Sequence, residues 1–271
     1  MATAEDRANA AGAERWRKIL TEGHKQLRLA HRLFRYLPSP PRCKGCHNPF
    51  GGLGGKLVGL FGFVRSRKNP NFCSMCCDRL PPGGAELDIA VLFADLRGST
   101  AMGEHLAPSA YAALLNQFYN SATEVLVRHD AIIDKLIGDE VMALFIPGIC
   151  GPEYHRRAVQ AVFDLLRAAG YDRAGKAWMP IGAAVHSGIA YVGNVGGDNL
   201  MDFTALGDPV NTASRLSSLA AAGEALVSET VYASVNREYP NLERRRLSLR
   251  GKVAPVDVRV LIPALPDSER V

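Results

Sequence analysis

The stretch that decides the fold runs from Asp88 to Thr100 and reads DIAVLFADLRGST. Its apolar part has the pattern of a buried strand, and Gly98 followed by Ser99 and Thr100 predicts a turn and a capped helix start. Asp95 does not fit this purely structural interpretation, because a lone carboxylate among apolar residues is costly to bury. We therefore expect Asp95 to have a partner elsewhere in the chain.

Outward from this stretch, strand-like and helix-like segments alternate from Glu86 onward. AIIDKLI and VMALFI flank a tight turn at Gly138-Asp139-Glu140, which predicts a hairpin. The other predicted strands are LDIAVLFADL, IGAAVHSG, IAYVGNVG, DFTALG and VDVRVLI, and the predicted helices span 103–128, 153–169 and 208–221. This order predicts an α+β fold of the ferredoxin-like βαββαβ type with additions, in which helices cover a largely antiparallel sheet.

Charge divides the chain of 271 residues into unlike parts. Residues 1–84 hold 15 Lys/Arg and 5 Asp/Glu, a net of +10, so of the total of 32 and 27 the remainder holds 17 and 22, a net of −5. We expect an N-terminal helical segment (1–41), a Cys-rich module with a linker ending at Pro81-Pro-Gly-Gly84 (42–84), and one large domain (85–265). The basic part suits an acidic partner or an anionic membrane surface, and a merely solvated basic face is an equal alternative.

Composition indicates an ordinary globular protein, with 47% hydrophobic and 22% charged residues. No apolar run approaches the roughly 20 residues needed to span a bilayer. The N-terminus lacks the apolar core of a secretory signal, so we expect a cytoplasmic protein without a transmembrane segment.

Residues 14–36 predict a helix with a heptad-like seam. Apolar or small residues recur at steps of four and three, at Trp16, Leu20, Gly23, Leu27, Ala30 and Phe34. One interpretation is a parallel coiled-coil contact in a dimer, and the other is an amphipathic helix that packs on its own domain. Gly23 and Ala30 weaken the seam and favour the second.

Two C-x-x-C pairs, Cys43/Cys46 and Cys73/Cys76, are separated by 26 residues. Each pair can place two thiolates on one ion, and two pairs complete a tetrahedral site. We expect structural Zn²⁺, with an iron–sulfur cluster as the alternative. Cys77 and His47 are spare ligands beside the pairs, whereas Cys150 stands apart as an inert thiol.

Aromatic residues in the same basic segment raise the alternative of nucleic-acid binding. They are Phe50, Phe61, Phe63 and Phe72. Such residues are more often core, so nucleic acid is disfavoured as a partner.

Asp139 is the expected partner of Asp95. If the predicted hairpin lies beside the 87–95 strand, both carboxylates converge on one edge of the sheet, where they would repel each other unless a cation intervened. Mg²⁺ prefers one or two carboxylates together with substrate phosphates, and two metals can activate an attacking oxygen and neutralise a leaving group. The backbone amides from Arg97 to Thr100 would cradle phosphate at a helix start.

Four stretches in order carry a specific resemblance: FADLRGST, KLIGDEVMALF, VHSGIAYVGNVG and FTALGDPVNTASRLSSLA. Together they resemble the motifs of the class III nucleotidyl cyclase catalytic domain over roughly residues 86–262. The resemblance does not cover the N-terminal 84 residues.

The resemblance implies a homodimer with active sites at the subunit interface, and a role for each matching residue. Asp95 and Asp139, with the Leu96 carbonyl, match the ligands of two Mg²⁺ or Mn²⁺ ions, and Asn211 and Arg215 match the pair that positions the ribose and stabilises the transition state. Lys135 and Thr204 match the pair that reads the purine, Gly98, Ser99 and Thr100 would meet the phosphates, and Lys252 resembles a triphosphate-binding lysine.

The implied reaction converts ATP to 3′,5′-cyclic AMP and pyrophosphate. Lysine can donate to adenine N1 and a threonine hydroxyl can accept from the N6 amino group, so Lys135 and Thr204 favour ATP. A guanylate cyclase, or a catalytically quiet redox or metal sensor built on the same fold, are the alternatives. In either case we expect the N-terminal Cys module to be regulatory.

Overall fold

The structure is a computed structural model that describes residues 4–22, 41–44, 46, 48–66, 70–78, 83–172, 177–197 and 200–263. Its helices are α1 (Ala4–Glu22), α3 (Gly52–Gly59), α4 (Ser74–Asp78), α5 (Ser99–His105), α6 (Pro108–Arg128), α7 (Pro147–Cys150), α8 (Tyr154–Ala168), α9 (Asp208–Leu219) and α10 (Glu229–Tyr232). Its strands are β1 (Gly83–Leu96), β2 (Ile132–Ile137), β3 (Glu140–Phe145), β4 (Ile181–Gly197), β5 (Leu200–Leu206), β6 (Ala225–Ser228), β7 (Glu243–Leu247) and β8 (Val256–Leu261). Among the helices described, none has both the length and the apolar character that crossing a bilayer demands.

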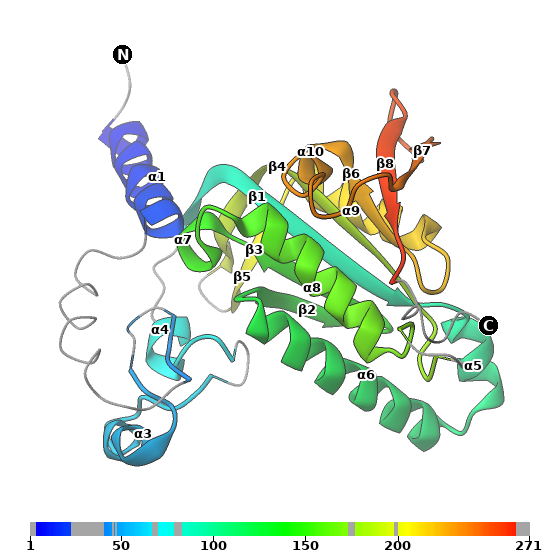
Figure 1. The fold of residues 1–271 in the computed structure, drawn as a ribbon. Coiled ribbons are helices and arrows are strands. Elements are labelled where there is room, and N and C mark those ends of the chain that lie inside the picture. Colours follow the sequence, from blue (N-terminus) through cyan, green and yellow to red (C-terminus); the bar gives the residue numbers. More distant parts are fainter. Residues whose placement is uncertain are drawn as a thin grey trace.

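All strands join one sheet in the order β2-β3-β1-β4-β6-β8-β7, with β5 paired to β4 (Figure 1). The pairs are antiparallel except β4 with β6. The predicted α+β fold and the β2–β3 hairpin are thus confirmed. Helices α6 and α8 cover one face of β1, and α1 and α9 cover the other, which is why its sequence is continuously apolar rather than alternating.

The two faces of β1 belong to different cores. Ala90, Leu92 and Ala94 pack with α6 and α8, whereas Ile89, Val91 and Phe93 lie in a second core with Trp16 of α1 and Ala213 of α9. Because side chains alternate along a strand, Asp95 falls on the same side of the sheet as Phe93. The residue singled out by the sequence is therefore on the α9 side.

Three predicted boundaries are corrected. IGAAVHSG and IAYVGNVG form the single long strand β4, since β1 pairs with it without interruption from Gly83 to Leu96. The predicted helix 103–128 is two helices, α5 and α6. Leu106 and Ala107 adopt extended backbone conformations before Pro108 and so interrupt the helix.

The predicted linker is also shorter than expected, because its last two glycines already belong to β1. Gly84 lies opposite Gly193 in the sheet. A Cβ there would stand 2.3 Å from the Val192 carbonyl oxygen, so glycine is what permits this close pairing.

Helix α1 packs on the sheet of its own chain. Trp16 and Leu20 are buried in the second core, and the Trp16 ring lies 6.3 Å from that of Phe203 on β5. Gly148 of α7 allows the close approach, since a Cβ would stand 2.4 Å from the Leu20 carbonyl oxygen. Two seam positions are thus used inside the chain, which favours the second interpretation of the seam; the seam positions from Gly23 to Phe34 lie outside the described residues.

Candidate active site and cysteine centre

The two aspartates are brought together by the pairing of β1 with β3. Asp95 lies opposite Glu140 in the register, and Asp139 occupies the preceding turn, where Gly138 has a φ of 60°. The Leu96 N–H donates to the Asp139 carbonyl oxygen at 3.2 Å. On α6, the Tyr119 hydroxyl donates to the Gly138 carbonyl oxygen, which holds the turn in place.

This edge of the sheet carries an excess of carboxylate. Burial raises the pKa of Asp95 to about 6, with Asp139 raising it further and the Arg97 guanidinium opposing the shift. Burial, and then the neighbouring Asp95, raise the pKa of Glu140 to about 7. Several carboxyl groups this close together ionise with difficulty, and a divalent cation between them would offset their repulsion. The oxygen donors present here therefore fit Mg²⁺ or Mn²⁺.

Arg97 is the cation that meets these carboxylates in the structure. Its guanidinium pairs with the Asp95 carboxylate and donates to the Ser218 carbonyl oxygen at 3.0 Å. Ser218 belongs to α9, so Arg97 also ties the end of that helix to β1.

The start of α5 differs from the prediction. Gly98 occupies the N-cap position in the left-handed conformation with a φ of 74°, and no side chain caps the helix. Ser99 and Thr100 lie inside the first turn, so the prediction that one of them is the cap is wrong. Glycine takes the cap position because the chain must reverse sharply from β1 into α5, which L side chains resist.

Lys135 and Thr204 meet across the sheet. The Lys135 ammonium on β2 donates to the Thr204 hydroxyl on β5 at 2.9 Å, and that hydroxyl donates to the Asp134 carboxylate at 2.8 Å. A register shift between Ile133 and Lys135 accounts for the neighbouring Asp134 being buried. Burial raises the pKa of Asp134 to about 6, although the Thr204 hydrogen bond and Lys135 oppose the shift.

Asn211 and Arg215 lie on α9, one turn apart and both exposed. The Arg215 guanidinium runs over Gly251, where a Cβ would stand 3.3 Å from its Nη1 atom. The adjacent Lys252 pairs with Asp208 at the start of α9. The structure therefore gathers the predicted Asn211, Arg215 and Lys252 around one helix.

Asn211 and Arg215 lie on one side of α9, and the carboxylate edge of the sheet faces its opposite side. Ser217 is fully buried and its hydroxyl lies 3.4 Å from the Glu140 carboxylate. Residues two apart on a helix point about 200° apart, so Arg215 faces away from the side that Ser217 presents to Glu140. Asn211 follows Arg215, because i and i+4 share a face. Within one chain, the pair on α9 and the aspartates do not face each other.

Sequence reasoning missed five partners of these residues. They are the Arg97 side chain, Asp134, Glu140, Asp202, which lies 3.1 Å from the Lys135 ammonium, and Asp208. Four of them lie one or two positions from a predicted residue, and Asp208 opens the helix that carries Asn211. The signal was present in the sequence as carboxylates beside Lys135 and Asp139, but their pairing depends on which strands adjoin.

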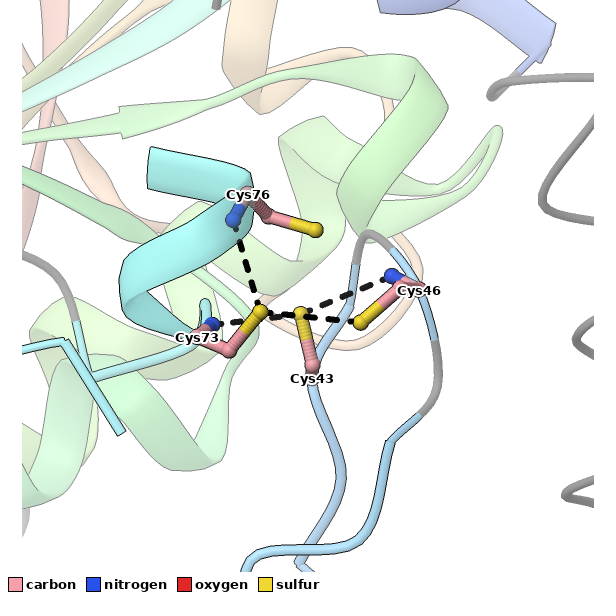
Figure 2. Close-up of side chains that lie close together, drawn as sticks. All are labelled: Cys43, Cys46, Cys73 and Cys76. Atoms are coloured by element: carbon pink, nitrogen blue, oxygen red, sulfur yellow. Dashed lines mark hydrogen bonds between the residues drawn. The ribbon is translucent and has the colours of Figure 1, made fainter. Parts of the chain in front are cut away.

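The four predicted cysteines converge from two segments, as Figure 2 shows. All four Sγ atoms lie within 4.8 Å of one another, and those of Cys46 and Cys73 are 3.6 Å apart. A tetrahedron around one ion with metal–sulfur bonds of about 2.3 Å has an edge of about 3.8 Å. The thiolate set therefore fits a single tetrahedral ion.

Backbone amides support the same sulfurs. The N–H groups of Cys46 and Cys73 point at the Cys43 sulfur, at 3.5 and 3.2 Å, and that of Cys76 points at the Cys73 sulfur at 3.4 Å. Hydrogen bonds from the neighbouring thiols, Cys46 first, lower the pKa of Cys43 well below its ordinary value. The same neighbours, Cys43 first, raise the pKa values of Cys73 and Cys76. All four sulfurs would therefore become thiolates together only with a cation between them. The side chain of Cys77 and all of His47 lie outside the described residues.

The remaining aromatic and thiol predictions are settled by packing. Phe50, Phe63 and Phe72 pack around the cysteine cluster, so these rings serve a core rather than stacking on nucleotide bases. Burial raises the pKa of Cys150 to about 12, in keeping with an inert thiol. Phe61, in contrast, is exposed.

The cysteine module is joined to the sheet at Asp130, immediately before β2. The Lys44 ammonium, on the residue after Cys43, lies 2.5 Å from one Asp130 carboxylate oxygen, and Arg157 of α8 lies 2.8 Å from the other. The buried Asn71 amide donates to the Ala131 carbonyl oxygen at 2.6 Å. Two residues near the clustered cysteines, Lys44 and Asn71, thus contact the segment that leads into β2, the strand that carries Lys135.

Comparison with known proteins gives one family. The family model described as the adenylate and guanylate cyclase catalytic domain matches residues 85–260. An adenylate cyclase of Anabaena cylindrica is 33% identical over 135 residues, which are 48% of this chain and 27% of that protein. An uncharacterized protein of Mycobacterium tuberculosis is 31% identical over 195 residues, 66% of this chain and 33% of that protein.

Solved structures agree. The crystal structure of the adenylyl cyclase CyaB from P. aeruginosa is similar with a TM-score of 0.56 and 30% identity, over 65% of this chain and 94% of that one. The guanylyl cyclase Cya2 is similar in fold, with a TM-score of 0.58 at 23% identity, over 70% of this chain and 98% of that one. The chain spans about a third or less of the length of the two curated relatives above.

Proposed function

The chain belongs to the family of adenylate and guanylate cyclase catalytic domains, and from this premise we propose that it converts ATP to 3′,5′-cyclic AMP and pyrophosphate. The observation that carries the choice of ATP is the contact between the Lys135 ammonium and the Thr204 hydroxyl at 2.9 Å. This pair offers a donor and an acceptor side by side, which is the pattern that complements adenine N1 and N6.

A homodimer completes each site in this proposal. The Asn211 and Arg215 face of α9 points away from the aspartates of its own chain, so it would serve the aspartates of a second copy. Large apolar side chains exposed on β2, β4 and β5 support such an interface, since contact with a second copy would cover them. They are Leu136, Ile137, Ile189 and Leu206.

Asp95 and Asp139, with the Leu96 carbonyl oxygen, would hold two Mg²⁺ or Mn²⁺ ions. The raised pKa of Asp95, caused first by burial, fits a carboxylate that awaits a cation. When bound, these ions would neutralise phosphate charge and lower the pKa of the ribose 3′-hydroxyl.

The chain's own residues then bind and orient the nucleotide. Lys135 and Thr204 hold the base, and the Gly98–Thr100 turn offers backbone amides to the phosphates. Asn211 would position the ribose, so that its 3′-oxygen attacks the α-phosphorus as the bond to pyrophosphate breaks. Arg215 would stabilise the negative charge that develops there, with Lys252 on the triphosphate.

The direct test is to supply purified protein with ATP and either Mg²⁺ or Mn²⁺, and separately with GTP, and to measure both cyclic nucleotides. We expect cyclic AMP as the main product. An excess of cyclic GMP would make the chain a guanylate cyclase. If neither cyclic nucleotide forms with Mg²⁺ or with Mn²⁺, the result would favour a catalytically quiet sensor.

Replacing Lys135 tests the base assignment. In Lys135→Ala we expect kcat/KM for ATP to fall about 10²-fold, because the adenine N1 and the buried Asp134 both lose a partner. The rate with GTP should change much less. Lys18→Ala, an exposed lysine on α1, is the matched control. An equal fall for both nucleotides would contradict the assignment and indicate a general structural role.

For the cysteine centre we propose one Zn²⁺ held by Cys43, Cys46, Cys73 and Cys76. Sulfurs within 4.8 Å of one another support a single ion over a four-iron cluster, in which each cysteine binds a separate iron and the sulfurs stand farther apart. With the metal bound, the module would keep Lys44 and Asn71 placed on the start of β2.

This contact is the proposed route of regulation. β2 begins two residues after Asp130 and carries Lys135, and its turn carries Asp139. Loss of the metal would release Lys44 from Asp130. β2 and its turn, which present Lys135 and Asp139, would then lose this contact with the module. Asp130 is held in a left-handed conformation with a φ of 62°, so its ion pairs also stabilise a backbone shape that non-glycine residues seldom adopt.

Removing the Lys44 contact tests this route. In Lys44→Gln we expect cyclase activity to fall roughly threefold to fivefold, the effect of one partly buried ion pair. Chelating the module's metal should lower wild-type activity further than it lowers that of Lys44→Gln, because the variant has already lost the link. Lys18→Gln, which removes an exposed pair on α1, is the control. Equal sensitivity of both proteins to chelation would contradict the route.

A further inference from the structure

The module presents an apolar surface that the rest of the described chain leaves uncovered. Helix α3 contains no buried residue, although its sequence, GLGGKLVG, is mostly apolar. Five large apolar side chains on α3 and the turn after it are between 53% and 86% exposed: Leu53, Leu57, Leu60, Phe61 and Val64. We call these five residues the α3 tip.

One glycine of α3 packs against the module. Gly55 lies against the Phe50 backbone, where a Cβ would stand 2.6 Å from the carbonyl carbon, so the glycine side of the helix faces the module. Leu53, Leu57 and Leu60 follow at steps of four and three and therefore share one face. In Figure 1, α3 is at the outer edge of the molecule, farther from the sheet than α4.

The charged residues around the α3 tip indicate the kind of partner that it suits. Residues 42–77 contain Lys or Arg at six positions and Asp or Glu at none. Lys56 is exposed on α3 itself, and Arg65 is exposed directly after the tip. An exposed apolar helix flanked by cations and free of acidic residues has the composition of an element that lies in the interface of an anionic bilayer.

Other occupants fit less well. If two copies met through this face, their Lys and Arg residues would be brought together with no acidic residue to pair with them. The repulsion between these like charges opposes such a contact. Nucleic acid would match the charge but would gain nothing from exposed leucines.

We propose that the α3 tip is a membrane-docking element, which inserts Leu53, Leu57, Leu60 and Phe61 among the headgroups of an anionic lipid bilayer. Lys56 and Arg65, which are exposed beside the tip, meet the headgroups in this arrangement. Insertion at headgroup depth makes this attachment peripheral and reversible. The proposal is independent of the nucleotide that the catalytic domain uses.

Vesicle sedimentation of the full chain, with its metal bound, tests the proposal. We expect binding to vesicles of phosphatidylcholine with about 30% phosphatidylglycerol, weak binding to phosphatidylcholine alone, and loss of binding as salt is raised, because salt screens the headgroup charge. The double variant Leu60→Ser/Phe61→Ser should bind at least tenfold less tightly, since it withdraws two large apolar groups. Leu106→Ser/Ile262→Ser removes two exposed apolar side chains elsewhere and should bind as the wild type does.

Lys56→Glu provides a second variant that keeps the tip's shape. It should weaken binding to anionic vesicles and leave metal content and melting temperature unchanged. Three results would overturn the proposal: no binding of wild type to anionic vesicles at low salt, binding that survives Leu60→Ser/Phe61→Ser, or equal binding to neutral vesicles. Self-association that depends on the tip, without vesicle binding, would assign the surface to a second copy instead.

Discussion

Mixing an Asp95→Ala chain with an Arg215→Ala chain is expected to restore activity that neither variant has alone. Each variant should lose nearly all cyclase activity, because one lacks a metal ligand and the other lacks the cation that meets the transition state. If the site is shared between subunits, a mixed dimer contains one site with both defects and one site with neither. After free exchange of subunits, half the dimers are mixed, so about a quarter of wild-type activity should return.

The physical reason lies in α9. Arg215 and Ser217 point about 200° apart, and Ser217 is the one that faces Glu140 beside the aspartates. The measurement is cyclic AMP formation across mixing ratios, with a maximum at equal amounts. Mixing Asp95→Ala with Asp139→Ala is the matched control, because both defects fall on the same half of the site and no complete site can form. No recovery in the first mixture, or recovery in the control, would contradict a shared site.

Loss of one cysteine ligand is the second large effect. In Cys73→Ser we expect the bound zinc to fall from one per chain to near zero and the 41–78 segment to unfold, while the sheet domain keeps its melting transition. Structural zinc in small domains contributes about 10 kcal/mol or more to folding. The module's own core is three buried cysteines with a few partly buried aromatic side chains, so little else would hold it.

Metal analysis and limited proteolysis of the same preparation measure this outcome. Cys150→Ser is the matched control, since Cys150 is also buried but lies away from the cluster and donates to the Asp130 carbonyl oxygen. Zinc that persists at one per chain in Cys73→Ser would remove Cys73 from the ligand set. Iron with absorption near the visible charge-transfer region would replace zinc by an iron-containing centre.

Much of the fold could be predicted because its determinants are local. Continuous apolar runs marked the buried strands, and Gly138 with Asp139 marked the hairpin turn. The helix break before Pro108 and the Gly98 cap are local features that were misjudged. For the strands, in contrast, the contact that decided the outcome was distant in sequence. β4 continues through Ser187 and Gly188 because all of β1 pairs with it, and Gly83 and Gly84 became strand because they lie opposite Asn194 and Gly193.

The sequence by itself singled out the residues proposed to carry the chemistry and predicted that Asp95 pairs with Asp139, because residue types and their order along the chain are what a motif records. Only the tertiary structure decided that Lys135 reaches Thr204, that Arg97 meets Asp95, and that Lys44 holds Asp130. It also decided that Asn211 and Arg215 turn away from the aspartates of their own chain. These relations depend on which strands adjoin and which side of α9 is buried, and burial and pairing are properties of the whole packed chain rather than of any stretch within it.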